Sequence, residues 1–311
     1  MLRNYTGPHP GYLGGAAEII MALTDLFGRK FITTVEIDPP RGVAIEKTLG
    51  KATVLRGFDA INIADSPMAR VRMSPVALAH LLRECMGIDT ILHMTCRDRN
   101  LLSLQSDLLG AYALGIQNVL ALTGDPVSVG DYPQATGVFD VTSEGLIRII
   151  SKLNSGTDLA GNKLSEPPRF CIGTAVNPTA ADLPKEIGRL ERKIEAGAHF
   201  ALTQPVYDLP LLDKFLSSMG NLKIPVLVGI LPLRSARQAE YLHNEVPGIN
   251  IPDEIRKRIH DAGEDSARET GIKIAIEFLQ QAKSRVAGAY FMPPVGDYDM
   301  AAQIVAESGI R

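Results

Sequence analysis

The sequence is poor in cysteine and contains no tryptophan. Three cysteines, Cys85, Cys96 and Cys171, are spread over 311 residues, and no CxxC pair occurs. This spacing argues against a disulfide framework and against a zinc ribbon. The six histidines lack the close spacing of a metal site and no HExxH sequence is present, so we expect no metal.

The chain also lacks a strong charge of one sign and long apolar runs. It carries 32 Lys and Arg residues against 35 Asp and Glu residues, with no basic stripe. Nucleic acid is therefore not an expected partner. The sequence contains no run of 18 apolar residues, so no membrane span is predicted. The N-terminal residues lack the apolar core of a signal peptide. We expect a cytoplasmic protein with no membrane partner.

Three widespread catalytic and nucleotide-binding motifs are missing as well. No GxGxxG sequence opens a helix after a strand, no Walker A sequence occurs, and no GxSxG elbow is found. These absences argue against a Rossmann dinucleotide site, a P-loop nucleotide site and a serine nucleophile on an elbow.

Short apolar runs alternate with amphipathic segments along the chain, and 45% of the residues are hydrophobic. This alternation predicts βαβ units and a parallel sheet, and eight strands fit a (β/α)8 TIM barrel. The predicted strands are Phe31–Ile37, Ala60–Ala64, Thr90–Met94, Asn118–Leu122, Phe170–Ala175, Phe200–Thr203, Val226–Ile230 and Ala287–Met292. The predicted helices between them are Pro75–Met86, Leu101–Leu114, Ser143–Leu153, Asp182–Ala196, Leu209–Met219, Ala236–Asn244 and Gly271–Ala282.

The domain organisation follows from the same pattern. We expect residues 1–30 to form an N-terminal extension with one helix near Gly15–Phe27, and residues 31–311 to form a single barrel domain. Residues 124–137 and 154–168 are rich in loop-forming residues such as Gly and Pro and are predicted to be loops. Neither is long enough to mark a second domain.

The stretch "FITTVEIDPP", residues 31–40, places two carboxylates at the end of an apolar strand. An unpaired carboxylate is costly to bury, so Glu36 needs either a partner or a function. Pro39 and Pro40 cannot donate ladder hydrogen bonds, and they predict the end of the strand. From the residues alone, a salt bridge at the barrel rim competes with catalysis for Glu36.

Polar residues follow most of the other predicted strands in the same way. Catalytic groups of a TIM barrel lie at the C-terminal ends of its strands. A single polar residue there is usually a cap, but the set predicts one ring of polar groups around the barrel mouth. Its members are Glu36, Asp65, Ser66, His93, Thr95, Thr123, Gly124, Asp125, Asn177 and Gln204.

Six ordered segments carry a family resemblance. They are "VEIDPP" (35–40), "HMTCRDRN" (93–100), "LALTGDP" (120–126), "ERKIEAGAHFALTQPVYD" (191–208), "PVLVGILPL" (225–233) and "AYFMPPVGDYD" (289–299). Together they resemble the flavin-dependent methylenetetrahydrofolate reductase family, in its short bacterial form and as the reductase half of fused methyltransferase–reductase proteins.

The resemblance implies a barrel that binds a flavin at its C-terminal mouth. The expected flavin is FAD, and FMN is the second choice. NADH or NADPH would reduce the flavin, which would then reduce 5,10-methylenetetrahydrofolate to 5-methyltetrahydrofolate in a ping-pong scheme. This reaction belongs to one-carbon metabolism and serves methionine biosynthesis. The family is usually oligomeric, so a homo-oligomer is expected.

The resemblance also implies roles for individual residues. Glu36 would support protonation of the folate at N5, and Asp125 would lie between folate and flavin as a second catalytic residue. Gln204 would contact the substrate, as would Glu36 and Asp125. The residues implied in cofactor binding are His93, Thr95, Thr123, Gly124, Asp125, Ala175, Asn177, Arg192 and Lys193.

The sequence departs from the family pattern near the expected flavin. Thr123 stands where some members have Arg, Pro205-Val206-Tyr207 stands where others have a run of Phe, and "NIADSP" (62–67) replaces another segment. These departures leave open an alternative, a flavin- or folate-binding subunit that receives electrons through a partner protein.

Two further residues invite other hypotheses. Lys193 could form a Schiff base as in barrel aldolases, although it lies in a charged helix rather than at a strand end. Cys96 has no evident base beside it, so we expect a packed side chain rather than a nucleophile.

Overall fold

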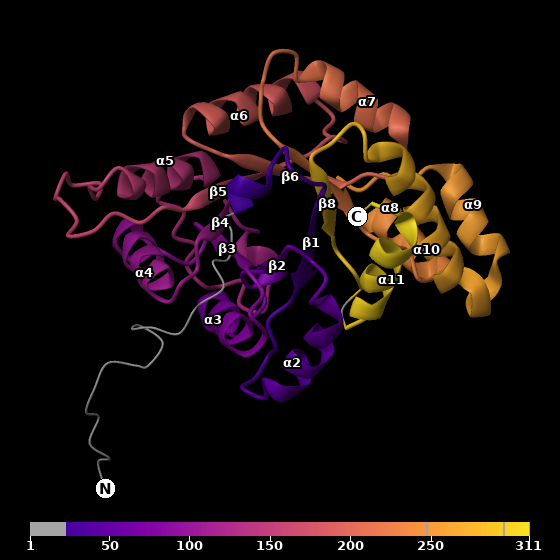
Figure 1. The fold of residues 1–311 in the computed structure, drawn as a ribbon, viewed down its shortest axis with the longest axis horizontal. Coiled ribbons are helices and arrows are strands. Elements are labelled where there is room, and N and C mark those ends of the chain that lie inside the picture. The colour runs from indigo at the N-terminus through magenta and orange to yellow at the C-terminus, as the bar shows by residue number, and fades with distance from the viewer. Residues whose placement is uncertain (1–22, 247, 295, 311) are drawn as a thin grey trace, which may run out of the picture.

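The computed structural model describes residues 23–310 apart from residues 247 and 295. Eight parallel strands close into a barrel in chain order, from β1 to β8, and β8 pairs with β1 (Figure 1). The strands are β1 (Ile32–Ile37), β2 (Ala60–Ile63), β3 (Thr90–Thr95), β4 (Asn118–Leu122), β5 (Cys171–Val176), β6 (Phe200–Pro205), β7 (Val226–Ile230) and β8 (Gly288–Phe291). The predicted TIM barrel is confirmed.

Helices surround the barrel in the order of the chain (Figure 1). They are α2 (Glu46–Ala52), α3 (Pro75–Met86), α4 (Leu101–Ala113), α5 (Ser143–Asn154), α6 (Leu183–Glu195), α7 (Leu209–Ser218), α8 (Ala236–Glu245), α9 (Asp253–Asp261), α10 (Gly263–Ala282) and α11 (Tyr298–Ser308). Short 3₁₀ turns lie at Thr53–Leu55, Pro67–Ala69 and Val127–Val129.

Two apolar layers account for the near-continuous hydrophobic runs of the strands. One layer lies between the strands and the helices and includes Val35 and Ile37. The other lies inside the barrel and includes Ile32 and Phe200. A strand that is buried on both faces has an almost unbroken run of apolar residues in its sequence. Because successive side chains alternate between faces, Glu36 points to the barrel axis while Val35 and Ile37 face the helices.

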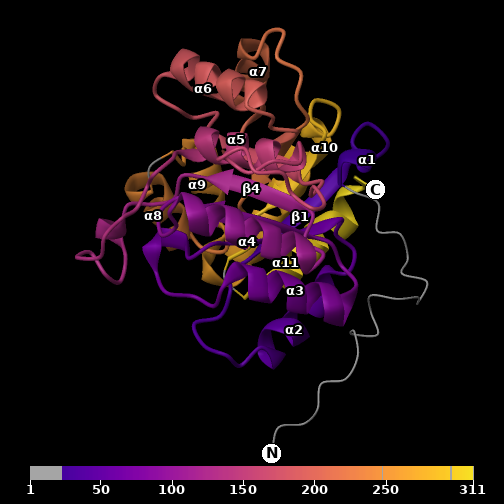
Figure 2. The ribbon, with the colours of Figure 1, turned by 90° about the vertical axis from the view of Figure 1, so that its left-hand side faces the viewer.

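A short N-terminal helix, α1 (Leu23–Leu26), packs against the inner layer. Leu23 is buried there, and the rings of Phe27 and Phe200 lie 5.7 Å apart. Figure 2 shows α1 at one end of the barrel, while the arrowhead of β4 points to the opposite end. The apolar residues of α1 thus close the N-terminal end, and the mouth at the C-terminal ends of the strands stays polar.

The predicted helix at Gly15–Phe27 falls mostly outside the described residues, which contain only its last turn as α1. The domain division at residue 30 stays a prediction for the same reason. The sequence patterns missed α2, α9 and α11 and started α10 eight residues too late. In α9 only Ile259 is buried, so an apolar stripe was too weak to recognise.

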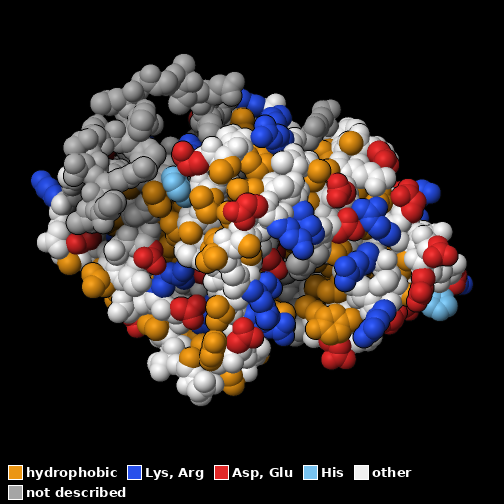
Figure 3. All heavy atoms as spheres, turned by 90° about the horizontal axis from the view of Figure 1, so that it is seen from below, with side chains coloured by type: hydrophobic (Ala, Val, Ile, Leu, Met, Phe, Trp, Pro, Cys, Tyr) orange, Lys and Arg blue, Asp and Glu red, His pale blue; other side chains and the backbone are white. Residues whose placement is uncertain are grey.

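Within the described part of the chain, no helix has the length and apolar character needed to cross a bilayer. Acidic and basic side chains are interspersed over the face shown in Figure 3, with apolar groups between them. That face therefore presents no continuous field of one sign.

Candidate active site

Two adjoining cavities open at the C-terminal mouth of the barrel. The first has a volume of about 400 Å³ and is lined by residues of β1, β3, β4, β5, β6 and β8 and of the loop after β2. The second, of about 490 Å³, extends toward α5 and α6. They share Leu122, Thr123, Ala175 and Gln204 as lining residues. The eleven residues to which the resemblance assigns a role all line one cavity or the other: Glu36, His93, Thr95, Thr123, Gly124, Asp125, Ala175, Asn177, Arg192, Lys193 and Gln204.

Glu36 lies on β1 at the floor of the first cavity. The hydroxyl of Tyr290, on neighbouring β8, donates a hydrogen bond to its Oε2 atom. Burial raises the pKa of Glu36 from 4.5 to about 7, the Tyr290 hydrogen bond works against this rise, and the charge of Asp38 adds to it. The side chain keeps 26% of its surface exposed. It can therefore be protonated near neutral pH and still reach a ligand in the cavity.

His93 on β3 faces the same carboxylate. Its Nδ1 lies 4.0 Å from Oε2 of Glu36, and its Nε2 lies 3.2 Å from Oδ1 of Asn62. Burial lowers the pKa of His93 to about 4, with the charge of Asp65 opposing the change. The imidazole is thus neutral at pH 7, so its contact with Glu36 is not an ion pair and does not hold the carboxylate ionised.

Asp38, the second carboxylate of the opening stretch, lies beyond the mouth. Its nearest basic partner is Arg72, at 3.9 Å. Burial raises the pKa of Asp38, and the Arg72 charge opposes the rise. Glu36 lines the cavity and Asp38 does not, so the geometry separates two residues that the strand pattern alone leaves equivalent.

Thr95 is held by Asp65, which follows β2. Oδ2 of Asp65 accepts hydrogen bonds from the backbone N–H and the hydroxyl of Thr95, both at 2.9 Å. Arg99 donates to the same oxygen at 2.7 Å and also pairs with Asp107 at 3.0 Å. The Thr95 hydroxyl is thus committed to Asp65, and the network fixes the end of β3 beside the cavity.

The segment after β4 depends on a glycine. Gly124 has φ +93°, and a Cβ atom there would come within 2.9 Å of Thr95 Cβ and 3.2 Å of Arg97 Cβ. The hydroxyl of Thr123 accepts a hydrogen bond at 3.0 Å from the backbone N–H of Ser143, at the start of α5. The two residues therefore shape the mouth through backbone geometry and helix capping.

Asp125 is exposed at the rim of the first cavity. Its Oδ2 accepts a hydrogen bond from the backbone N–H of Met68 at 2.8 Å. This contact ties the loop after β4 to the loop after β2. Ser66, Met68 and Ala69 all have positive φ, a conformation that is strained for residues other than glycine.

The second cavity is basic along α6. Nζ of Lys193 donates to the carbonyl of Ala175 at 2.8 Å. Burial lowers the pKa of Lys193, and the charge of Glu186 opposes this shift. Arg192 is half exposed and pairs with Glu144 at 3.1 Å, while Arg189 also lines the cavity. These cations suit an anionic ligand.

Asn177 and Gln204 differ in how free their side chains are. Oδ1 of Asn177 accepts from the backbone N–H of Thr179 at 3.0 Å and from its hydroxyl at 2.7 Å. It therefore stabilises the turn after β5. Gln204 is exposed, lines both cavities, and makes no side-chain hydrogen bond with the residues that the structure describes. Its amide is available to a ligand.

Several residues of the site were not among the predicted ones, and Tyr290, Arg99 and Arg97 illustrate why. Tyr290 lies within an apolar strand, where the sequence pattern predicts a tyrosine that packs in the hydrophobic core. Asp65 was recognised as a strand-end residue, but its partner Arg99 lies too far along the chain for spacing to reveal the pair. Arg97 lies two residues after β3 and is 2% exposed, although arginine is rarely buried. As expected, Cys96 is buried, and burial raises the pKa of its thiol to about 11.

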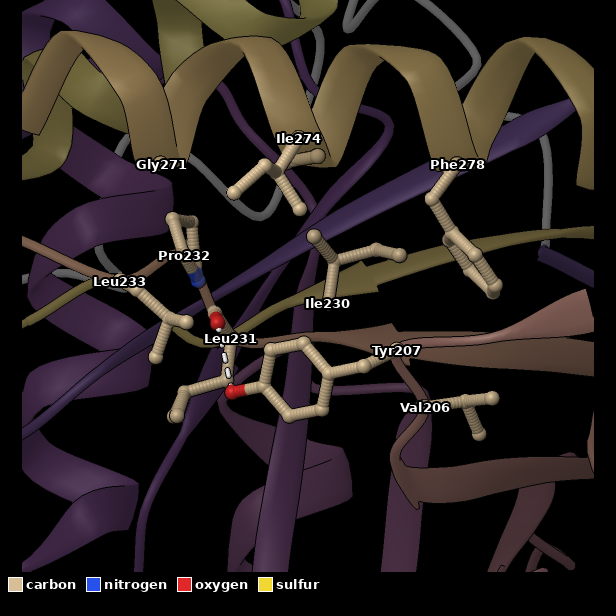
Figure 4. Close-up of a pocket in the computed structure, with 10 residues that line it drawn as sticks. Val206, Tyr207, Ile230, Leu231, Pro232, Leu233, Gly271, Ile274 and Phe278 are labelled. Atoms are coloured by element: carbon tan, nitrogen blue, oxygen red, sulfur yellow. Dashed lines mark hydrogen bonds between the residues drawn. The ribbon is translucent and has the colours of Figure 1, made fainter. Parts of the chain in front are cut away.

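A separate small cavity of about 20 Å³ lies between the ends of β6 and β7 and helix α10 (Figure 4). Its lining is apolar apart from Tyr207, whose hydroxyl donates to the carbonyl of Leu231 at 2.9 Å. Figure 4 shows Ile274 and Phe278 of α10 pointing toward Ile230 across this space. A space of this size holds one water molecule, so it is a packing gap rather than a ligand site.

Comparisons with known proteins identify the family of this chain. The family model for methylenetetrahydrofolate reductase matches residues 22–305. The chain belongs to the methylenetetrahydrofolate reductase family. Methylenetetrahydrofolate reductase 1 of Schizosaccharomyces pombe is 26% identical over 219 residues, which cover 66% of this chain and 33% of that protein. The chain thus spans about a third of the length of that relative.

A bacterial relative is similar over most of its length. The 5,10-methylenetetrahydrofolate reductase of Buchnera aphidicola is 24% identical over 257 residues, covering 79% of this chain and 80% of that protein. Among solved structures, a Clostridium thermocellum protein described as binding two copies of 5-methyl-5,6,7,8-tetrahydrofolic acid has a TM-score of 0.59 and 16% identity. It covers 89% of this chain, with 93% of its own chain matched, and it shows the same fold.

Proposed function

We propose that this member of the methylenetetrahydrofolate reductase family reduces 5,10-methylenetetrahydrofolate to 5-methyltetrahydrofolate, with FAD as cofactor and NADH or NADPH as electron donor. Glu36 carries the proposal. Its pKa of about 7 makes it a proton donor near neutral pH, and it lines the mouth of the barrel. Forming a 5-methyl product breaks the bond between the methylene carbon and N10, so the proton must go to the leaving N10 rather than to N5, the position that the resemblance implied. We infer that Glu36 supplies this proton.

The remaining groups of the first cavity suit the polar edge of a pterin. Gln204 offers both an amide donor and an acceptor, and Asp125 offers a carboxylate at the rim. We infer that these two side chains orient the pterin ring so that the N10 side of the methylene bridge faces Glu36. The neutral imidazole of His93 completes the floor without placing a positive charge beside the acid.

The residues present also fit a flavin dinucleotide. Gly124 lets the loop after β4 pack closely against Thr95 and Arg97 beside the first cavity, and the basic groups of the second cavity, Lys193, Arg192 and Arg189, suit a diphosphate. Bound there, the flavin would take a hydride from the nicotinamide and deliver it to the folate. Glu186 and Glu144 keep the cations of this cavity in place through ion pairs with Arg189 and Arg192.

Anaerobic spectroscopy of the purified protein tests the proposal. We expect a yellow protein whose flavin absorbance bleaches with NADH or NADPH and returns when methylenetetrahydrofolate is added. A colourless protein that FAD and FMN cannot reconstitute would refute it. Bleaching by dithionite, with folate-dependent reoxidation but no response to either nicotinamide, would instead favour a subunit that receives electrons through a partner protein.

A further inference from the structure

Arg97 is a buried cation with an unsatisfied hydrogen-bond donor. Only 2% of its surface is exposed. Nε and Nη2 pair with the neighbouring Asp98 at 2.8 to 3.0 Å, whereas Nη1 is buried without a hydrogen-bond partner among the described residues. Leaving a charged donor unpaired in the interior is costly, so its retention calls for a ligand.

The position of Arg97 indicates where that ligand lies. Arg97 lines the first cavity of the mouth and also a third cavity of about 170 Å³ between the loops after β2, β3 and β4. It is the one lining residue that these two cavities share. The two cavities therefore adjoin at Arg97.

The third cavity combines positive charge with an aromatic surface. Arg70 lines it, is exposed, and makes no side-chain hydrogen bond or ion pair with the residues that the structure describes. Tyr132 and Val127 contribute apolar surface, and Asp98 offsets only one of the two guanidinium groups. Such a cavity suits an aryl group that ends in an oxyanion.

Asp125 and Asp131 lie near this site but do not line the third cavity, and each binds a backbone N–H group of the loop after β2. Asp125 accepts from the backbone of Met68, and Asp131 accepts from the backbone of Val71 at 3.0 Å. These contacts hold the loop after β2 against the loop after β4. Three residues of the first loop have positive φ values, which are strained for residues other than glycine, and the two contacts maintain this conformation beside Arg97.

We propose that Arg97 and Arg70 bind an oxyanion at the far end of a ligand whose ring system occupies the barrel mouth. This inference rests on the proposed function, which offers two sources of the oxyanion. They are the glutamate carboxylates of the folate and the diphosphate of a dinucleotide. The basic cavity along α6 lies on the other side of the mouth and suits a diphosphate. The Arg97 cavity is thereby left to the folate tail, with the benzoyl ring against Tyr132.

Equilibrium binding with matched ligands tests this assignment. The ligands are 5-methyltetrahydrofolate triglutamate, 5-methyltetrahydropterin without the benzoyl-glutamate tail, and FAD. The variants are Arg70→Gln, Arg97→Gln and Arg56→Gln, an exposed control at the turn after α2. We expect Arg70→Gln to weaken binding of the tailed folate about threefold at low salt, and Arg97→Gln about tenfold, with the pterin, FAD and the control unaffected.

Each outcome decides one point. If Arg70→Gln behaves like Arg56→Gln for every ligand, the oxyanion site is wrong, and this holds even if the buried Arg97→Gln fails to fold. If FAD binding weakens instead of folate binding, the folate assignment is wrong and the diphosphate is the anion. Tail-dependent binding in a protein that does not reduce folate would remove the proposed function and leave this inference standing.

Discussion

Tyr290 donates a hydrogen bond to Glu36 across the β8–β1 pair that closes the barrel. The bond opposes the effect of burial, because a donated hydrogen bond stabilises the ionised carboxylate. The hydroxyl thus orients the acid toward the mouth and also keeps its pKa from rising further. Tyr290 itself stays protonated, since burial and the neighbouring Glu36 charge raise the pKa of its hydroxyl well above the usual value.

Replacing Tyr290 with Phe removes the hydroxyl and keeps the ring. We expect the pKa of Glu36 to rise by about one unit, so that the group remains an acid to higher pH. In stopped-flow reoxidation of the reduced enzyme by methylenetetrahydrofolate, the alkaline fall in rate should move upward by the same amount. Reduction by NAD(P)H serves as the internal control and should keep its pH profile. An unshifted profile for the folate step would show that the hydroxyl does not act on Glu36.

Glu36→Gln should separate the two half-reactions. The amide cannot donate a proton to the leaving N10 as an acid, so the folate half-reaction should slow by about 100-fold or more. Flavin binding and flavin reduction by NAD(P)H should persist, because neither needs this proton. Asp38→Asn is the matched control on the same strand end, and its folate rate should stay within a few-fold of wild type. Equal loss of both half-reactions in Glu36→Gln would contradict the role of Glu36 as an acid.

The same substitution should change the pH dependence of stability. The folded state holds a proton on Glu36 up to about pH 7, whereas the unfolded chain loses it near the ordinary value of 4.5. Ionisation therefore costs the folded state progressively more between pH 4.5 and 7, by up to about 3 kcal/mol above that window. Glu36→Gln escapes this cost, so the apoprotein variant should gain in free energy of unfolding relative to wild type when urea melts at pH 8 are compared with those at pH 5. A constant difference between the two pH values would argue against a raised pKa.

The barrel and its polar mouth were predictable because apolar strands and amphipathic helices alternate regularly along the sequence. Alternating apolar strands and helices indicate a parallel sheet, and strand ends such as Glu36, His93 and Gln204 converge by topology alone. Side-chain pairs across the barrel were not predictable in this way. The contact between Glu36 and Tyr290 joins residues 254 positions apart, and Arg97 has no pattern that distinguishes a buried arginine from an exposed one. Such features depend on packing, which one sequence does not reveal.

Lys193 can be tested as a phosphate contact rather than an imine-forming residue. Lys193→Gln should weaken FAD binding about tenfold, because it removes a partly buried charge from the basic cavity. Lys185→Gln, on an exposed position of the same helix, is the matched control and should bind FAD like wild type. Fluorescence titration of the apoprotein with FAD provides the measurement. Trapping of a substrate imine on Lys193 by borohydride would instead support the aldolase-type hypothesis.

Gly124→Ala tests whether the mouth requires a residue without a side chain. The new Cβ would meet Thr95 and Arg97, and φ of +93° adds backbone strain. Gly161 has nearly the same φ, +90°, but nothing lies within 4 Å of its Cβ position. Gly161→Ala should therefore cost only about 1 kcal/mol in free energy of unfolding, from the backbone. Gly124→Ala should cost about 2 kcal/mol more through overpacking, with weaker flavin binding, because Thr95 and Arg97 must move. Equal destabilisation by the two substitutions, measured by urea unfolding, would show that close packing at Gly124 does not shape the site.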